Sequence, residues 1–292
     1  MRVKPASGEP TNAVYGFTTI LLKILRELKP DYIAAAFDLP GQTFRHIAYE
    51  RYKAQRPETP SDLSSQFSKV RRVLGAFDIP VIDKEGYEAD DVIGTIAKKM
   101  AGKKDIEVIV VTGDMDALQL VGPRLKVYSM KKGISETAIY DKKAVKERFG
   151  FNPDQLTDFK GLKGDPSDNI PGVKGIGEKT ATELVKEFGT IEGLYKAVKK
   201  GSKKISGAVL EKLKAGEEDA KFSKELATIN KDASILFRLE DAEWNGGPEY
   251  AKAAPLFQEL GFLSLLKRIN KEEEKTSSRQ EMLIAAGGSH EK

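Results

Sequence analysis

The stretch IEVIVVTGDMD (residues 106–116) indicates the fold most directly. Apart from Glu107, its first six residues are apolar and β-branched, which is typical of a strand buried on both faces. Asp114 and Asp116 follow where this strand ends. A second apolar run, Tyr32–Phe37 (YIAAAF), ends in the same way at Asp38. We therefore expect two strands of one sheet, each with acids at its carboxyl end.

Helical patterns alternate with the predicted strands in the first half of the chain. Apolar residues recur at helical spacing over 12–28, 62–76 and 89–100, whereas short strands are predicted over 80–82, 125–130 and 137–140, the last two as a hairpin. This alternation favours an α/β fold with a mainly parallel sheet. Such sheets bind ligands beyond the carboxyl ends of their strands. The sequence thus predicts a ligand site at an acidic sheet edge.

The pattern changes after about residue 150. Residues 153–270 lose the strand signal and contain short helical patterns joined by Gly-rich turns. We therefore expect residues 1–152 to form an α/β core and residues 153–270 to form a second, α-helical domain. Residues 271–292 are polar and are expected to be a flexible tail.

The stretch EGYEADDVI (residues 85–93) places Glu88, Asp90 and Asp91 directly before a helical pattern. One interpretation is structural, because the dipole of a helix stabilises acids in its first turn by roughly 0.3–1 kcal/mol each. The other is a cation site, because two carboxylates about 4 Å apart repel by roughly 4 kcal/mol at an effective dielectric of about 20. If these acids and those at the strand ends converge, a hard cation such as Mg²⁺ or Mn²⁺ favours the second interpretation.

The stretch GLKGDPSDNIPGVKGIGEKTA (residues 161–181) adds two acids and a glycine pattern. Asp165 and Asp168 are either ordinary turn residues or further acids of the site. A tight hairpin before a helix is predicted by the three glycines that follow, Gly172, Gly175 and Gly177. Such a hairpin exposes backbone N–H groups that bind phosphate without reading bases. The alternative is a simple packing unit of two helices and a turn.

The amino-acid composition limits which kinds of catalytic or metal site the chain can form. The 292-residue chain has a formal net charge of +4, no cysteine and two histidines. It excludes disulfides and thiolate chemistry and disfavours a Ser-His-Asp triad or a multi-histidine zinc site, which leaves carboxylates, lysines and hard metal ions. We interpret His46 as a structural or phosphate-side hydrogen-bonding residue. No secretory h-region and no apolar run of membrane-spanning length is present, which predicts a cytoplasmic protein.

Two regions are strongly basic. Residues 44–72 carry an excess of Lys and Arg, with Tyr49 and Tyr52 among them, as contacts with nucleic acid require. Residues 196–214 are rich in lysine and form either a solvated helix face or a second basic surface. Because the net charge is small, any nucleic-acid surface must be local.

Six ordered motifs make a family resemblance specific: FDLPGQTFRH, YKAQR, GYEADDVIGT, TGDMDALQL, GLKGDPSDNIPGVKGIGEKTA and LFQELGF. Over roughly residues 8–268 the chain resembles the 5′-nuclease domain of bacterial family-A DNA polymerases, in the flap-endonuclease group. The resemblance implies a nuclease core with a basic helical arch at about 44–72 and a helix-hairpin-helix in the helical domain. It also implies a structure-specific 5′–3′ exonuclease and flap endonuclease of replication and repair, which hydrolyses DNA or RNA-primed phosphodiesters by two-metal catalysis.

The resemblance also implies a role for each matching residue. Two Mg²⁺ or Mn²⁺ ions would be held by the family's metal-site acids, Glu88, Asp90, Asp91, Asp114, Asp116, Asp165 and Asp168. Asp38 closes the family's second strand close to that site, and Lys53 and Arg56 would contact the scissile phosphate and the threaded strand. The expected DNA-binding residues are Arg45, Tyr52, Lys53, Arg56, Gly172, Lys174, Gly175, Gly177, Lys179 and Thr180, with K⁺ at the hairpin.

The chain departs from the family at both ends. The family opens with an LIDG-type strand whose Asp is a metal ligand, whereas the seven residues before Gly8 contain no acid. Three explanations compete: a start assigned too far downstream, which we favour, a degenerate DNA binder, or metal binding by the seven remaining carboxylates. Beyond Leu266 no polymerase sequence follows, so we expect a monomeric stand-alone nuclease that acts with a separate polymerase, unless the gene continues elsewhere.

These departures leave alternative functions open. The leading hypothesis is the nuclease, acting on DNA with a 5′ flap, a nick or an RNA primer. The first alternative is a non-catalytic module that binds branched DNA. The second is a carboxylate-rich ribonuclease of similar sheet topology.

Overall fold

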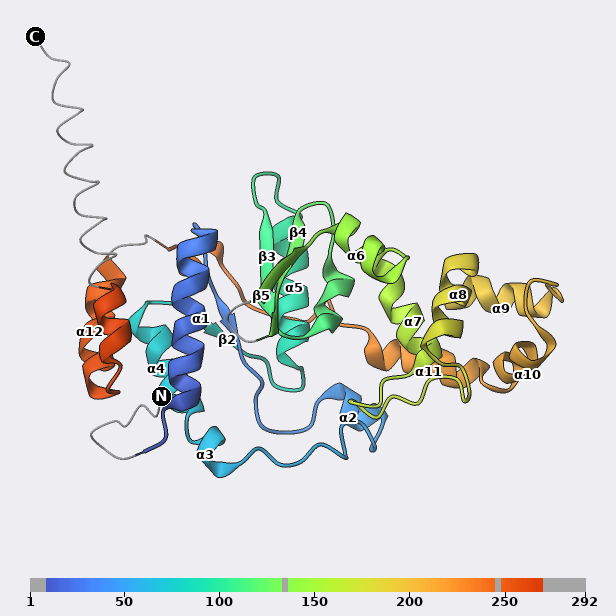
Figure 1. Ribbon diagram of the computed structural model, residues 1–292, viewed down its shortest axis with the longest axis horizontal. Coiled ribbons are helices and arrows are strands. Elements are labelled where there is room, and N and C mark those ends of the chain that lie inside the picture. Colours follow the sequence, from blue (N-terminus) through green and yellow to red (C-terminus); the bar gives the residue numbers. More distant parts are fainter. Residues whose placement is uncertain (1–8, 133–135, 245–247, 270–292) are drawn as a thin grey trace, which may run out of the picture. The chain divides into compact units, whose positions relative to one another are not determined.

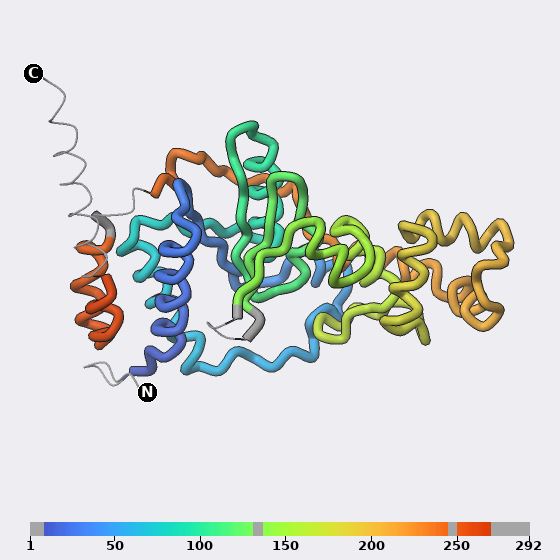
Figure 2. The backbone as a smooth tube through the Cα atoms, turned by 45° about the horizontal axis from the view of Figure 1, so that its top comes forward, coloured from blue at the N-terminus to red at the C-terminus, as the bar shows by residue number. Residues whose placement is uncertain are grey.

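The computed structural model describes residues 9–132, 136–244 and 248–269, and Figures 1 and 2 show the course of the chain. The chain divides into two compact units. The first comprises Met1–Ala35, Glu58–Ile82 and Phe237–Lys292, and the second comprises Ala36–Pro57 and Asp83–Leu236. The expected domain boundary at 152/153 lies inside the second unit and stays a prediction. The expected tail over 271–292 lies outside the described residues.

Helices dominate the first unit. In it, α4 (Phe67–Ala76) packs against both α1 (Asn12–Leu28) and α12 (Pro248–Glu259), as the neighbouring ribbons in Figure 1 show. Phe77, which is fully buried, follows α4, and its ring meets those of Tyr250 and Phe257 at centroid distances of 5.8 and 6.0 Å. These edge-on aromatic contacts fix the centre of this core.

The N-terminus of α1 is capped from a distance. The sequence allows Thr11 or Asn12 as the cap, but Thr11 makes no side-chain capping bond. Instead, the amides of Ala13 and Val14 donate to Oε1 of Gln66, at 2.9 and 3.3 Å. Gln66 is 2% exposed and lies between α3 (Ser61–Ser64) and α4, so the single helix expected over 62–76 is interrupted there.

A two-stranded sheet joins β1 (Ala35–Ala36) to β2 (Val81–Ile82). The strand expected over Tyr32–Phe37 is therefore shorter than predicted, and the expectation that it shares one sheet with the strand of residues 106–111 is wrong, because it pairs with β2 in a sheet of its own. Its first half finds a different partner, because Tyr32 bridges to Glu243 and the amide of Ile33 donates to the carbonyl of Ala242 at 2.7 Å. Apolar periodicity could not reveal that pairing, since the partner segment lies some two hundred residues away in sequence.

The second unit is built on a three-stranded sheet of β3 (Val108–Thr112), β4 (Leu125–Lys132) and β5 (Glu136–Tyr140). β3 and β4 are parallel, and β4 and β5 form the expected antiparallel hairpin. α5 (Ala89–Ala101) packs on β3. The core between them includes Val110, Leu118 and Val127, which are at most 5% exposed.

The rest of the second unit is helical, as predicted. Its elements are α6 (Lys142–Phe149), α7 (Leu156–Lys163), α8 (Glu178–Phe188), α9 (Ile191–Lys199), α10 (Gly207–Ala215) and α11 (Glu217–Ala227), with 3₁₀ turns η1 (Met115–Leu120) and η2 (Pro153–Gln155). The first unit has η3 (Leu239–Ala242). α7 packs closely on α11 at Gly161, where a Cβ atom would lie 2.8 Å from the carbonyl oxygen of Ala220.

The basic region over 44–72 is not one continuous helix. α2 (Phe44–Ala48) is a single short helix, after which the chain forms turns up to about residue 56. The N-terminus of α2 is fixed by His46, whose Nδ1 accepts from the amide of Thr43 at 3.2 Å. This contact agrees with the structural interpretation of His46. Within the described residues, no helix is both long and apolar enough to cross a membrane.

Candidate active site

Acids gather at the N-terminus of α5. Glu88 is the N-cap residue, and its amide donates to Oδ2 of Asp91 at 3.0 Å, which completes a capping box. Asp38, which follows β1, accepts a hydrogen bond from the amide of Ala89 at 2.7 Å. The positive end of the helix dipole stabilises these negative charges. The structural interpretation of this acidic cluster is thus correct for part of it.

A second group of acids follows β3. Asp114 is the N-cap of η1, and its Oδ1 accepts from the amide of Asp116 at 2.8 Å. The hydroxyl of Thr112, the last residue of β3, accepts from the amide of Asp114 at 3.0 Å. The turn after β3 is thereby fixed with its carboxylates beyond the strand end, as the pattern of the sequence predicted.

Asp90 shows that these acids converge. Burial raises the pKa of its carboxyl from 3.8 to about 7, and the charges of Asp114, Glu88, Asp116 and Asp38 add to the shift. The acids therefore act on one another although they come from three separate segments. An excess of carboxylate charge around a half-buried acid fits a hard divalent cation. In the part of the chain that the structure describes, however, no three acids stand ready as ligands of one ion.

This raised pKa predicts how stability depends on pH. Because the folded chain holds the Asp90 proton more tightly than the unfolded chain does, the contribution of Asp90 to stability should be fully present below about pH 3.8 and should be lost as the pH rises from there through about 7. From pH 5 to 8 without metal, we expect this group to lower the free energy of unfolding by roughly 1–4 kcal/mol. Urea unfolding in EDTA at several pH values measures this change in the free energy of unfolding. Asp114→Asn, which removes a neighbouring charge, should make the dependence shallower, and equal slopes in the two proteins would contradict the assignment.

Lys160 is a functional candidate that sequence reasoning missed. It lies on α7, where its Nζ is 2.5 Å from Oδ2 of Asp165 and also contacts Oδ1 of Asp116. Hydrogen bonds from Lys160 and from Ser167 outweigh the effect of burial and lower the pKa of Asp165. Nothing distinguishes Lys160 from other helical lysines in the sequence, except that it stands five residues before Asp165 at the end of a helix.

Cations from the basic region occupy another part of the site. Lys53 donates to Oε1 of Glu88 at 2.7 Å, and Arg56 pairs with Asp168. The amide of Lys53 donates to the carbonyl of Asp168 at 3.0 Å and holds Lys53 in the left-handed region at φ 55°, which costs a non-glycine residue roughly 1 kcal/mol or more. The structure thus brings Lys53 and Arg56 together with Glu88 and Asp168, and the roles implied for them at a phosphate and at metal ions stay predictions.

The side chains of Arg45 and Asp91 have other partners than the predicted ones. They form a bidentate ion pair at 2.7 and 2.8 Å, and they are 3% and 0% exposed. The second oxygen of Asp91 also accepts from the amide of Asn230 at 2.7 Å. The predicted DNA contact of Arg45 and the predicted metal contact of Asp91 do not fit this arrangement, because both charged groups are covered and already bonded.

Tyr52 is a further correction among the expected DNA-binding residues. Its side chain is 3% exposed, and its hydroxyl donates to Glu88 at 3.2 Å. Burial first, and then the charge of Glu88, raises the pKa of the tyrosine far above its usual value, so the group remains a hydrogen-bond donor. Tyr52 therefore supports the acidic site from beneath, where a DNA strand has no access to it.

The glycine hairpin has a buried and an exposed side. Gly172 (φ 63°) is buried and donates its amide to the Ser223 hydroxyl at 2.9 Å; a Cβ here would lie 2.2 Å from the amide nitrogen of Gly164. Val173 and Ile176 anchor the hairpin in the core. The exposed residues are Lys174, Gly175, Gly177 and Lys179, and Thr180 is half-buried. Apart from Gly172 and the half-buried Thr180, the predicted DNA-binding residues of the hairpin are thus open to solvent.

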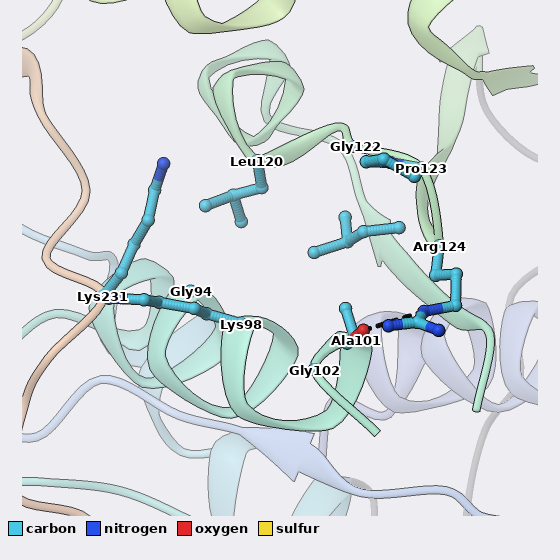
Figure 3. A pocket seen from close by; sticks show the side chains of 10 residues that line it. Gly94, Lys98, Ala101, Gly102, Leu120, Gly122, Pro123, Arg124 and Lys231 are labelled. Atoms are coloured by element: carbon cyan, nitrogen blue, oxygen red, sulfur yellow. Dashed lines mark hydrogen bonds between the residues drawn. The ribbon is translucent and has the colours of Figure 1, made fainter. Parts of the chain in front are cut away.

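A pocket of about 510 Å³ lies toward the other end of α5 (Figure 3). Lys98, Arg124 and Lys231 are among its lining residues, and none of the predicted site residues is. Lys98 pairs with Asp232 at 2.7 Å, and Arg124 donates to the carbonyl of Ala101 at 2.9 Å. The pocket is therefore separate from the acidic site, and two of its cations are already engaged.

The fold and the site together define a class of protein. Carboxylates at the strand ends of an α/β core, cations beside them and a glycine hairpin leading into a helix are the parts of a phosphodiester-cleaving nuclease. The chain belongs to the 5′-3′ exonuclease family: residues 1–150 match its N-terminal resolvase-like domain, and residues 151–249 match its C-terminal SAM fold. The family resemblance read from the six motifs is confirmed.

Individual relatives agree with this assignment. The chain is 44% identical over 282 residues to DNA polymerase I of Bacillus caldotenax, covering 95% of this chain and 32% of that one. It is 42% identical over 276 residues to DNA polymerase I of Bacillus subtilis, covering 94% and 31%. The chain thus spans about a third of the length of these curated relatives.

Solved structures share the fold. T5 5′-exonuclease with bound zinc superposes with a TM-score of 0.60 at 20% identity, covering 92% of this chain and 93% of that one. The catalytic core of Rad2 in complex with DNA substrate gives 0.53 at 18% identity, covering 83% and 78%. The predicted combination of an α/β nuclease core and a C-terminal helical domain is confirmed.

Proposed function

We propose that this chain is a structure-specific 5′–3′ exonuclease and flap endonuclease that acts on DNA in replication and repair. The observation that carries the proposal is the convergence of Asp38, Glu88, Asp114 and Asp116 around Asp90. Such a concentration of charge is costly to the fold, as the raised pKa of Asp90 shows. A cost of this kind is typical of a functional site, since a purely structural helix cap needs only one or two acids.

Two Mg²⁺ or Mn²⁺ ions suit the chemistry of the carboxylates at this edge, which would have to move to coordinate them because no three acids in the described residues are placed as ligands of one ion. The residues that would hold them are Asp38, Glu88, Asp90, Asp114, Asp116, Asp165 and Asp168, all oxygen donors suited to hard cations. When bound, such ions supply an activated water and stabilise the charge of the phosphoryl transition state. Asp91 is left out of this set, because its carboxylate is enclosed by Arg45 and backbone amides.

Lys53 and Arg56 would orient the phosphodiester. In the substrate-free chain they are held by Glu88 and Asp168, so they already stand at the acidic edge when DNA arrives. A phosphate oxygen offers each of them a second anionic partner at little reorganisation cost. Arg56, half exposed and bonded also to the carbonyl of Ser167, is the more accessible of the two.

The glycine hairpin would hold the duplex. Its exposed amides and the ammonium groups of Lys174 and Lys179 contact phosphates without regard to sequence, so binding should weaken with salt. K⁺ at the hairpin is part of the same proposal. In this structure the carbonyl of Gly175 accepts from Lys212 at 2.9 Å, so a K⁺ ion bound there would share that oxygen with an ammonium group.

Cleavage of a labelled 5′-flap duplex tests the function. The chain should cut near the flap junction with Mg²⁺ and should not cut with EDTA, and Glu88→Ala or Asp114→Ala should abolish cutting. Nicked and RNA-primed duplexes, and an all-RNA flap, identify the preferred substrate. Tight binding without cleavage in Mg²⁺ and in Mn²⁺ would instead support a branched-DNA-binding module, and preference for the RNA flap would support a ribonuclease.

A further inference from the structure

We propose that Lys160 is a built-in counter-cation of the acidic site: it holds Asp116 and Asp165 together while no metal is bound, and a divalent ion at this position must displace it. This inference rests on the proposed function, because it concerns the metal site of the nuclease. It adds a residue that regulates metal affinity from within the protein.

The contacts of Lys160 carry the inference. Its ammonium group bonds to Asp116, in the turn after β3, and to Asp165, after the end of α7. The side chains of the three residues are 17%, 23% and 16% exposed, so the cluster is largely removed from water. Attraction between charges is stronger in such surroundings than at an open surface. The ammonium group thus offsets one of the two negative charges in the absence of metal.

The ammonium group of Lys160 occupies the place that a metal ion between Asp116 and Asp165 would need. A small divalent cation approaches carboxylate oxygens to about 2.0–2.2 Å. The Nζ atom already lies 2.5 Å from Oδ2 of Asp165, between that oxygen and Asp116. A cation bridging the same two oxygens would lie against Nζ and would be repelled by it. Lys160 and a bridging ion therefore exclude each other, and the flexible lysine is the one that can move.

Near Asp90, the carboxylates have fewer bonded cations than they have near Lys160. Asp90 is acted on by Asp38 and Asp114, and in the described residues none of these three carboxylates is bonded to an ammonium or guanidinium group, whereas Glu88 pairs with Lys53 and Asp116 pairs with Lys160. An ion held by Asp38, Asp90 and Asp114 gains their attraction without displacing a cation. Of two ions at this site, the one near Asp90 should therefore bind more tightly than the one between Asp116 and Asp165.

Mn²⁺ binding to the metal-free, DNA-free protein tests the inference by calorimetry. Lys160→Met keeps the length of the side chain and removes its charge, and it should tighten the weaker Mn²⁺ site at least about tenfold. Lys163→Met is the matched control: it lies on the same helix, and its pair with Glu178, at 3.0 Å, is solvent-exposed. The control should leave Mn²⁺ affinity unchanged. Unchanged or weaker Mn²⁺ binding in Lys160→Met would overturn the inference.

Thermal unfolding keeps the test decisive if Lys160→Met folds poorly without metal. Lys160→Met should melt lower than the wild type in EDTA, and Mn²⁺ should raise its midpoint by more than it raises that of the wild type. Lys160→Arg, which keeps the charge, should not gain Mn²⁺ affinity; a gain equal to that of Lys160→Met would overturn the role of charge.

The fate of the proposed nuclease function can be read separately. If the wild type cuts no flap but Lys160→Met still gains Mn²⁺ affinity, the nuclease proposal fails and the assignment of Lys160 stands. If the wild type cuts flaps and the affinities are equal, the reverse holds. If neither protein binds Mn²⁺, the assignment of Lys160 is overturned.

Discussion

Asp90→Asn should make the protein more stable and far less active at the same pH. At pH 8 the wild-type carboxylate is ionised although burial and four neighbouring acids oppose its charge. The neutral amide removes that repulsion, so we expect the free energy of unfolding in EDTA to rise by roughly 1–3 kcal/mol. Below about pH 3.8, where Asp90 is protonated in both the folded and the unfolded chain, the variant should gain almost nothing.

The activity of Asp90→Asn should fall by at least about 100-fold in Mg²⁺, because even the outer partners of metal ligands affect metal affinity or activity by about 10–100-fold. Flap cleavage at pH 8 measures this, and urea unfolding of the same preparation measures stability. Asp105→Asn is the control, since Asp105 is exposed between α5 and β3 and the charge change is identical. A variant that loses both stability and activity would show that Asp90 is a structural residue.

The acids at the strand ends could be predicted because backbone direction places them. Once an apolar run is recognised as a strand, the residues directly after it must lie at its carboxyl end, as Asp38 and Asp114 do. Strand and helix periodicity is a local property, and so the positions of α1, α5 and β3 follow from the sequence within a few residues. The metal-binding roles of these acids remain predictions.

The partners of the charged side chains could not be predicted, because they depend on packing between distant segments. Arg45 and Asp91 are 46 residues apart, and Arg45 also donates to the carbonyl of Leu226, 181 residues away. The basic composition of residues 44–72 suggested that Arg45, Lys53 and Arg56 all contact DNA. In fact Arg45 and Arg56 have opposite environments, one covered and one half exposed, which composition does not distinguish.

The ion pair between Arg45 and Asp91 should be the most destabilising contact to break in the second unit. Arg45→Met leaves the fully buried Asp91 without a counter-charge, and Asp91→Leu leaves the guanidinium unpaired; each should cost roughly 3–5 kcal/mol. The carbonyls of Leu226 and Thr228, which accept from Arg45 at 2.9 and 2.8 Å, lose their donor only in Arg45→Met. Arg45→Met should therefore be the more damaging of the two.

The double variant Arg45→Met/Asp91→Leu distinguishes the energy of the ion pair itself from the energy of the contacts that each residue makes with its other neighbours. With both charges gone, an apolar contact can fill the same space, so the loss should be smaller than the sum of the single losses by about 2 kcal/mol or more. Urea unfolding of the four proteins gives this coupling energy. Flap cleavage should nevertheless stay impaired, because Asp91 also accepts the amide of Glu88 and so fixes that acid at the start of α5. Additive losses would show that the two residues stabilise the fold independently, and full activity in the double variant would show that Glu88 needs no such support.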